Sequence, residues 1–165
     1  MNWYMVFKFL HIVAVIALVG GLFARQLVRR YAKKADDIKE FATLNHVAGR
    51  IERILVIPGS TATLVFGVIL SLIGGLPIFG FLQGASQNWL LVSNILLVVS
   101  LLLMPMFVFF PRGKRFEPIL QAALAKGEIT SELRAAMDDN VVRLAHLIEE
   151  VSVIAITALM VFKPF

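Results

Sequence analysis

Four long runs of apolar residues, separated by polar segments, set the pattern of this chain. The runs cover residues 3–24, 51–75, 89–110 and 144–162. At a rise of about 1.5 Å per residue, a helix of about 20 apolar residues crosses the hydrocarbon core of a bilayer. We therefore predict one all-α domain over residues 1–165, an integral membrane four-helix bundle with a single span in each run.

The polar segments between these runs differ in charge. Residues 25–53 and 111–143 hold fourteen of the sixteen lysines and arginines, whereas residues 76–88 hold no charged side chain. Basic loops tend to remain on the cytoplasmic side of a membrane. This distribution predicts that both charged segments are cytoplasmic and that both termini lie outside (N-out/C-out).

Local signals predict where the helices end. The second helix is expected to begin near Ile51, with a kink or local unwinding at Pro58, and the third helix is expected to stop at Pro111. A separate interfacial helical segment, ended by Gly127, is then expected between the third and fourth spans. Its apolar face consists of Phe116, Ile119, Leu120 and Ala123.

Composition narrows the class of protein. Hydrophobic residues make up 59% of the chain and charged residues 16%, which is typical of a membrane protein. The absence of cysteine excludes disulfides, iron–sulfur ligation and covalent haem attachment. The net charge of +5 comes from residues that flank the spans, so we expect a lipid bilayer and no nucleic acid as partner. We expect the bacterial cytoplasmic membrane, with the first span retained because no basic region precedes it.

Lys8 and His11 interrupt the first apolar run. A histidine within the hydrocarbon is costly and is by default a candidate functional residue. Ala14, Ala17 and Gly21 lie beside the face that carries His11 and would admit a close neighbouring helix. We expect His11 to face protein, either as a metal ligand or hydrogen-bonded to a serine or threonine of another helix.

Charged residues also gather at the predicted cytoplasmic ends of the second and fourth spans. These are Glu52, Arg53, Arg143, His146, Glu149 and Glu150. They predict an interfacial salt-bridge network, in which Glu150 pairs with Arg53 or Arg143, and a proton relay is the alternative. His146 is about 13 Å deeper than His11, so the two cannot share one metal with bonds of about 2 Å.

The order of several short motifs resembles one known family. These motifs are Lys8-x-x-His11, Gly21-Leu22-Phe23, Glu52-Arg53 with Pro58, Trp89-Leu90, Glu150 and Lys163-Pro164-Phe165. The series is similar to the HemJ family of four-helix, haem-binding protoporphyrinogen IX oxidases and their uncharacterised integral membrane relatives. The likeness extends over all four spans.

The resemblance implies a haem b site. In that family the histidine of the first helix is a candidate axial ligand of the haem iron. The corresponding residue here is His11, which the resemblance makes the metal ligand. The family's helix 3 begins Trp-Leu-x-x-Lys, and its lysine is replaced here by Ser93, a poor iron ligand. The resemblance places Ser93 opposite His11 and makes Arg53 a candidate anchor for the haem propionates.

Two functions follow from these residues. The first is a haem b-binding membrane redox protein related to protoporphyrinogen oxidase, acting on a porphyrin or passing electrons to a quinone. The alternative is a non-catalytic structural or accessory subunit of a larger respiratory or photosynthetic membrane complex, which Ser93 in place of lysine favours. In either case we expect a homo-oligomer or a subunit of a larger assembly, and the residues identify no catalytic group.

Overall fold

The computed structural model describes residues 2–164, and all regular structure in that range is helical. The elements are α1 (Trp3–Ala32), α2 (Ile38–Ile51), η1 (Glu52–Val56), α3 (Ile57–Ile73), η2 (Gly80–Gln83), α4 (Trp89–Val98), η3 (Val99–Leu103), η4 (Pro105–Phe109), α5 (Phe110–Lys126), α6 (Ser131–Met137) and α7 (Asn140–Phe162). Four helical segments of 30, 36, 38 and 32 residues are long and apolar enough to cross a membrane. The all-α, four-span prediction is confirmed.

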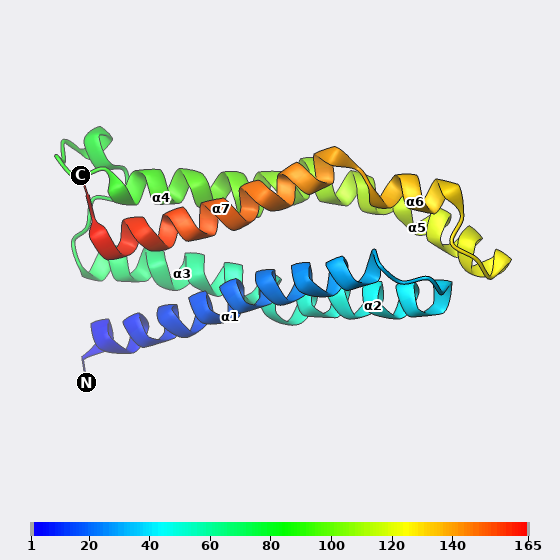
Figure 1. The fold of residues 1–165 in the computed structure, drawn as a ribbon. Helices are drawn as coiled ribbons and strands as arrows, with labels where there is room; N and C mark the ends of the chain where they lie inside the picture. The colour runs from blue at the N-terminus through cyan, green and yellow to red at the C-terminus, as the bar shows by residue number, and fades with distance from the viewer. Residues whose placement is uncertain (1, 165) are drawn as a thin grey trace.

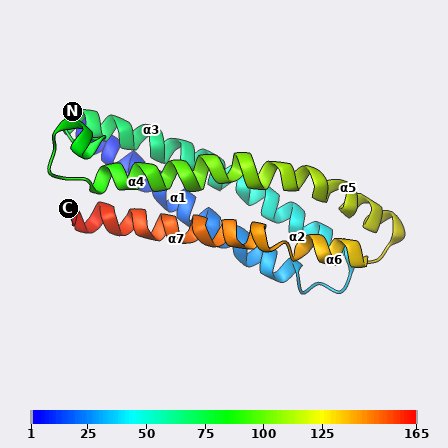
Figure 2. The same cartoon turned by 90° about the horizontal axis from the view of Figure 1, so that it is seen from above.

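The helices pair into two antiparallel hairpins (Figure 1). In the N-terminal hairpin, residues 3–73, α1 packs along α2, η1 and α3. In the C-terminal hairpin, residues 89–162, α4 and the helix that continues it pack along α6 and α7. The two termini lie at one end of the bundle, and α2, α5 and α6 lie at the other, as Figure 2 also shows from above. We call the latter the inner end, because the basic residues predict that it faces the cytoplasm.

Glycines allow α1 and α3 to touch backbone to backbone. A Cβ at Gly59 would lie 2.8 Å from the backbone nitrogen of Leu18, and one at Gly21 would lie 2.8 Å from the Cβ of Leu55. No larger residue fits at such an approach without moving a helix. The close neighbour predicted from the small residues of the first span is therefore confirmed: it is the second span, with η1 against Gly21 and α3 beyond it.

The inner end has a small apolar core of its own. Side chains from the end of α1 and from α2, α5 and α6 are buried together there: Ala32, Ala35, Ile38, Phe41, Leu120, Ala123 and Leu133. Asp37 caps α2 by accepting a hydrogen bond from the backbone N–H of Glu40, 3.2 Å away, and Thr130 caps α6 in the same way. This core brings residues of both hairpins together beyond the membrane-spanning part.

Two predicted helix ends are wrong. The second helix begins at Ile38 rather than near Ile51, because the capped polar segment α2 runs directly into the second span. The third helix does not stop at Pro111 but continues to Lys126, so the expected interfacial segment is its extension. The predicted end at Gly127 is confirmed, since this residue adopts a left-handed conformation with φ of 74°.

Prolines explain why the long helices widen locally. A proline lacks the N–H donor and its ring clashes with the carbonyl four residues earlier. Each π-helical segment ends two residues before a proline, and the backbone N–H of the residue between them donates to the carbonyl five residues back. These bonds are Ile57 to Glu52 before Pro58, Met104 to Val99 before Pro105, and Phe110 to Pro105 before Pro111. The helices thus continue through the prolines with a distortion instead of ending.

Candidate functional site

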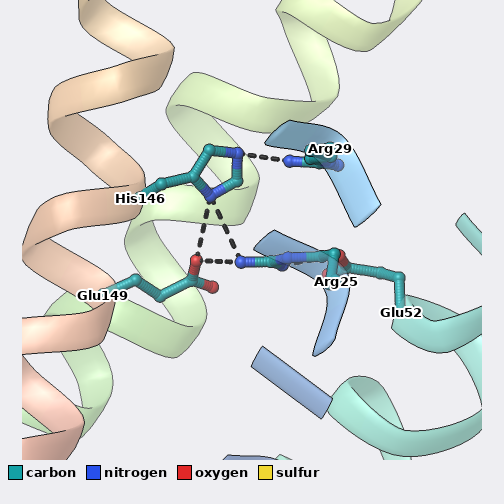
Figure 3. Close-up of polar contacts among 5 residues, drawn as sticks. All are labelled: Arg25, Arg29, Glu52, His146 and Glu149. Atoms are coloured by element: carbon teal, nitrogen blue, oxygen red, sulfur yellow. Dashed lines mark hydrogen bonds and ion pairs between the residues drawn. The ribbon is translucent and has the colours of Figure 1, made fainter. Parts of the chain in front are cut away.

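A buried ion cluster connects the two hairpins near the inner end of the bundle (Figure 3). Its centre is Arg25 of α1, which is 1% exposed. One guanidinium nitrogen of Arg25 lies 2.5 Å from Glu52 Oε2, and the other lies 2.5 Å from Glu149 Oε2. Glu52 belongs to the N-terminal hairpin and Glu149 to α7. Arg25 therefore holds one carboxylate from each hairpin.

His146 of α7 extends this cluster to a second arginine. Its Nδ1 lies 3.2 Å from Glu149 Oε2, and its Nε2 contacts the guanidinium of Arg29. Phe109 of η4 stacks on the imidazole with ring centroids 4.4 Å apart. The ring is thus fixed by contacts on both nitrogens and on one face.

The partners of His146 determine its protonation state. A guanidinium can only donate, so Nε2 must accept from Arg29, whereas a carboxylate can only accept, so Nδ1–H donates to Glu149. His146 is accordingly neutral with its proton on Nδ1. The 3.2 Å approach of Arg25 to the same Nδ1 is then a contact between two donors, which the Arg25–Glu149 ion pair holds in place.

With a neutral imidazole, the charges of the cluster cancel. Arg25 and Arg29 contribute two positive charges, and the two glutamates contribute two negative charges. Removing one partner of such a buried pair leaves an uncompensated charge and costs about 3–5 kcal/mol. The cluster is therefore a cross-link whose members depend on one another.

The predicted salt-bridge network at the inner ends of the second and fourth spans exists, but it contains only some of the predicted residues. Glu52, His146 and Glu149 are in the cluster, whereas Arg53 and Arg143 are exposed. Glu150 has no ion pair within 4.0 Å among residues 2–164, so its predicted pairing with Arg53 or Arg143 is wrong. Adjacent helix residues point about 100° apart, and α7 turns Glu149 rather than Glu150 towards α1.

Arg25 and Arg29 were missed because they follow the apolar run and counted only as loop charges. The helical period of α1 would have found Arg25, because the buried positions Ala14, Leu18, Gly21 and Arg25 recur every three or four residues. Arg29 lies one turn further on the same face. A basic residue that continues the buried face of a span is a candidate for pairing with a carboxylate of another helix.

His11 faces protein, as predicted, and it contacts α3. Its Nδ1 lies 3.1 Å from the backbone carbonyl oxygen of Thr63, which can only accept, so Nδ1–H is the donor. Gly67 leaves space for the imidazole, since a Cβ there would lie 3.2 Å from His11 Cε1. One of the two alternatives predicted a hydrogen bond to the side chain of a serine or threonine, but the partner is the backbone carbonyl of Thr63 and not a hydroxyl. Whether His11 also ligates a metal stays a prediction.

Ser93 is buried in α4 and is 1% exposed. Its hydroxyl donates to the carbonyl oxygen of Trp89 at 2.8 Å, one turn earlier in the same helix. Lys163 lies 5.4 Å above the ring of Trp89, so two motifs of the family resemblance meet near the outer end. The last residue of that motif, Phe165, lies outside the described residues. Cofactor contacts at Ser93 and at the exposed Arg53 stay predictions.

Together these features define a class: a four-span helical membrane protein whose two hairpins are cross-linked by buried charges. The chain belongs to the DUF2269 family, described as predicted integral membrane proteins, and the family model matches residues 5–164. Neither a comparison with curated proteins nor one with solved structures finds a match. The protein is thus an integral membrane protein of this family.

Proposed function

We propose that this protein is a haem b-binding membrane redox protein related to the HemJ family, with His11 as the axial ligand. The observation that carries the proposal is the hydrogen bond from His11 Nδ1–H to the Thr63 carbonyl oxygen. A neutral imidazole that donates from Nδ1 presents its lone pair at Nε2. Metal-ligating histidines have this arrangement, in which the second nitrogen is fixed by a carbonyl or carboxylate.

The surroundings of His11 fit this role. None of the hydrogen bonds among residues 2–164 involves its Nε2, and the side chain is only partly buried. Gly67 provides the space that the ring occupies. A polar nitrogen without a partner is costly in hydrocarbon, so a ligand at Nε2 would stabilise the protein.

The other residues would assist in different ways. Arg53 is exposed at the inner end and has no carboxylate within 4.0 Å among the described residues, so it is available to an anionic group. Ser93 is a weaker candidate, because its hydroxyl is already bonded within α4. A haem held at His11 would supply one-electron redox chemistry. The chain would supply the ligand, its orientation and the exclusion of water.

Spectroscopy of the purified protein tests this proposal. With haem supplied during expression or in detergent, we expect a Soret band that His11→Ala abolishes. Ser93→Ala and His146→Ala should retain the band, because neither residue is the ligand. Gly67→Leu should weaken haem retention without removing the ligand, since its Cβ would displace the His11 ring.

One observation favours the accessory-subunit alternative. Ser93, where HemJ proteins carry lysine, is buried and satisfied by its own helix, so it does not offer a second ligand. Folded, haem-supplied protein without a Soret band would refute the haem proposal and leave the accessory role. A band that survives in His11→Ala would refute the ligand assignment.

A further inference from the structure

Two adjoining cavities lie beside the ion cluster, on the side of α1 that faces α5 and α7. The larger has a volume of about 580 Å³ and the smaller about 480 Å³. They share Gln26, Arg30 and Arg143 in their linings, so they lie side by side, and we call the two together the groove. Volumes of this size are typical of sites for small organic ligands.

The groove is strongly basic. Six cationic side chains line it, against the two carboxylates Asp139 and Glu150. The cations are Arg29, Arg30, Lys33, Arg112, Arg115 and Arg143. Two of them are already paired, Arg112 with Asp139 at 2.8 Å and Lys33 with Asp138 at 3.1 Å.

The other four cations form no ion pair in the part of the chain that the structure describes. Among residues 2–164, Arg30, Arg115 and Arg143 have no carboxylate oxygen within 4.0 Å. Arg29, which is partly buried beside the cluster, contacts only the neutral ring of His146. Several guanidinium groups around one cavity form a site for an anion, and the geometry of guanidinium suits phosphate oxygens.

The apolar part of the groove lies further along α7. Leu144 and Leu147, which are 56% and 54% exposed, line the smaller cavity, on the same helical face as Arg143. From Arg143 this face runs into the membrane-spanning part of α7 and reaches Glu150. The carboxylate of Glu150 would repel an anion, so the charged part of a ligand belongs at the arginine end and its apolar part along the leucines.

We propose that this groove binds an anionic phospholipid of the inner leaflet, with its phosphate on Arg30 and Arg143 and an acyl chain along Leu144 and Leu147. A basic pocket between membrane helices on the cytoplasmic side is the expected site of an anionic headgroup. A soluble phosphate ester shares the headgroup chemistry but would leave both leucines exposed. The apolar surface favours the lipid as the source of the phosphate.

The inference rests on the arginines and not on haem, and its test is separate. The purified full chain is exchanged into detergent, and bound lipid is measured by native mass spectrometry and by thermal unfolding. Phosphatidylglycerol should bind and raise Tm, and phosphatidylcholine at the same concentration should do so far less. Glycerol 3-phosphate should have no effect, because it lacks the acyl chains.

Variants locate the site. Arg30→Gln and Arg143→Gln should each weaken phosphatidylglycerol binding about fivefold, which is the effect of one basic residue near an anionic headgroup. Both side chains are exposed and unpaired with carboxylates, so these variants should fold normally. Arg134→Gln is the matched control, since this exposed arginine of the inner end lines neither cavity.

Three results would overturn the proposal. Equal binding of phosphatidylcholine, whose choline cancels the charge of its phosphate, would show that the net negative charge of the headgroup is not recognised. A weakening by Arg134→Gln as large as that by Arg143→Gln would show attraction to the whole basic surface. Stabilisation by glycerol 3-phosphate equal to that by phosphatidylglycerol would identify a soluble phosphate ester as the ligand instead.

Discussion

Replacing Glu149 by glutamine removes one negative charge from the ion cluster while preserving the shape of the side chain. Glu149 is 1% exposed and lies 2.5 Å from the guanidinium of Arg25, so the lost charge cannot be replaced by water. Arg25 keeps Glu52, but the cluster then carries a net positive charge. We expect a loss of about 3 kcal/mol, the lower end of the range for breaking a buried pair.

Thermal unfolding in detergent measures this loss. For a chain of this size, 1 kcal/mol corresponds to a shift in Tm of about 2–4 °C, so Glu149→Gln should lower Tm by about 6–12 °C. Glu150→Gln is the matched control: the same substitution one residue along α7, at a half-exposed carboxylate without an ion pair among residues 2–164. It should change stability by less than about 0.5 kcal/mol.

A double-mutant cycle separates the ion pair from general damage. Arg25→Gln alone leaves the carboxylates of Glu52 and Glu149 with Arg29 as the one cation of the cluster, so the cluster becomes net negative. Arg25→Gln with Glu149→Gln leaves Glu52 and Arg29, whose charges cancel. The double variant should therefore be less destabilised than the sum of the two single variants. Equal Tm values for Glu149→Gln and Glu150→Gln, or an additive cycle, would refute the cluster as a cross-link.

Two other expectations concern packing and orientation. Gly59→Ala should lower the free energy of unfolding by about 1–3 kcal/mol, because its Cβ would lie 2.8 Å from the Leu18 backbone. Gly20→Ala, where no atom lies within 4 Å, should be neutral or stabilising in the same denaturation assay. Reporter fusions after Gly84 and after Lys126 should report the periplasm and the cytoplasm respectively, and the reverse result would contradict the orientation derived from the basic residues.

Much of the fold is predictable from the sequence because hydrophobic length alone defines a membrane span. The four apolar runs predicted the four crossing segments, and Gly127 predicted a helix end, where the structure has a left-handed backbone conformation. The prediction from proline was wrong at Pro111, which was expected to end a helix that continues to Lys126. A proline removes one backbone hydrogen bond of the helix. A neighbouring π-turn costs less free energy than ending the helix there, because the residues further on are stabilised by packing.

The candidate site was predictable only in part. Polar residues at the ends of the second and fourth spans indicated an ionic network, and three of its members are in it. The choice of Glu149 over Glu150 could not be made, because it depends on the rotation of α7 against α1, which a short sequence pattern does not define. Arg25 was overlooked since its charge resembled that of the adjacent loop, although its position continues the buried face of α1.

The ion cluster lies between the two hairpins, where the bilayer provides little hydrophobic driving force for association. Lipid is as apolar as the helices, so two separately inserted hairpins gain little hydrophobic free energy by associating. Within each hairpin, close approaches such as Gly59 against Leu18 supply dense packing, but between the hairpins the direct contacts are fewer. Two features stabilise the association of the hairpins instead: the apolar core at the inner end, which includes Phe41 and Leu133, and the ion pairs and hydrogen bonds of Arg25 and His146. Because a half-assembled cluster would leave charges unpaired, it favours only the arrangement in which both hairpins meet in register.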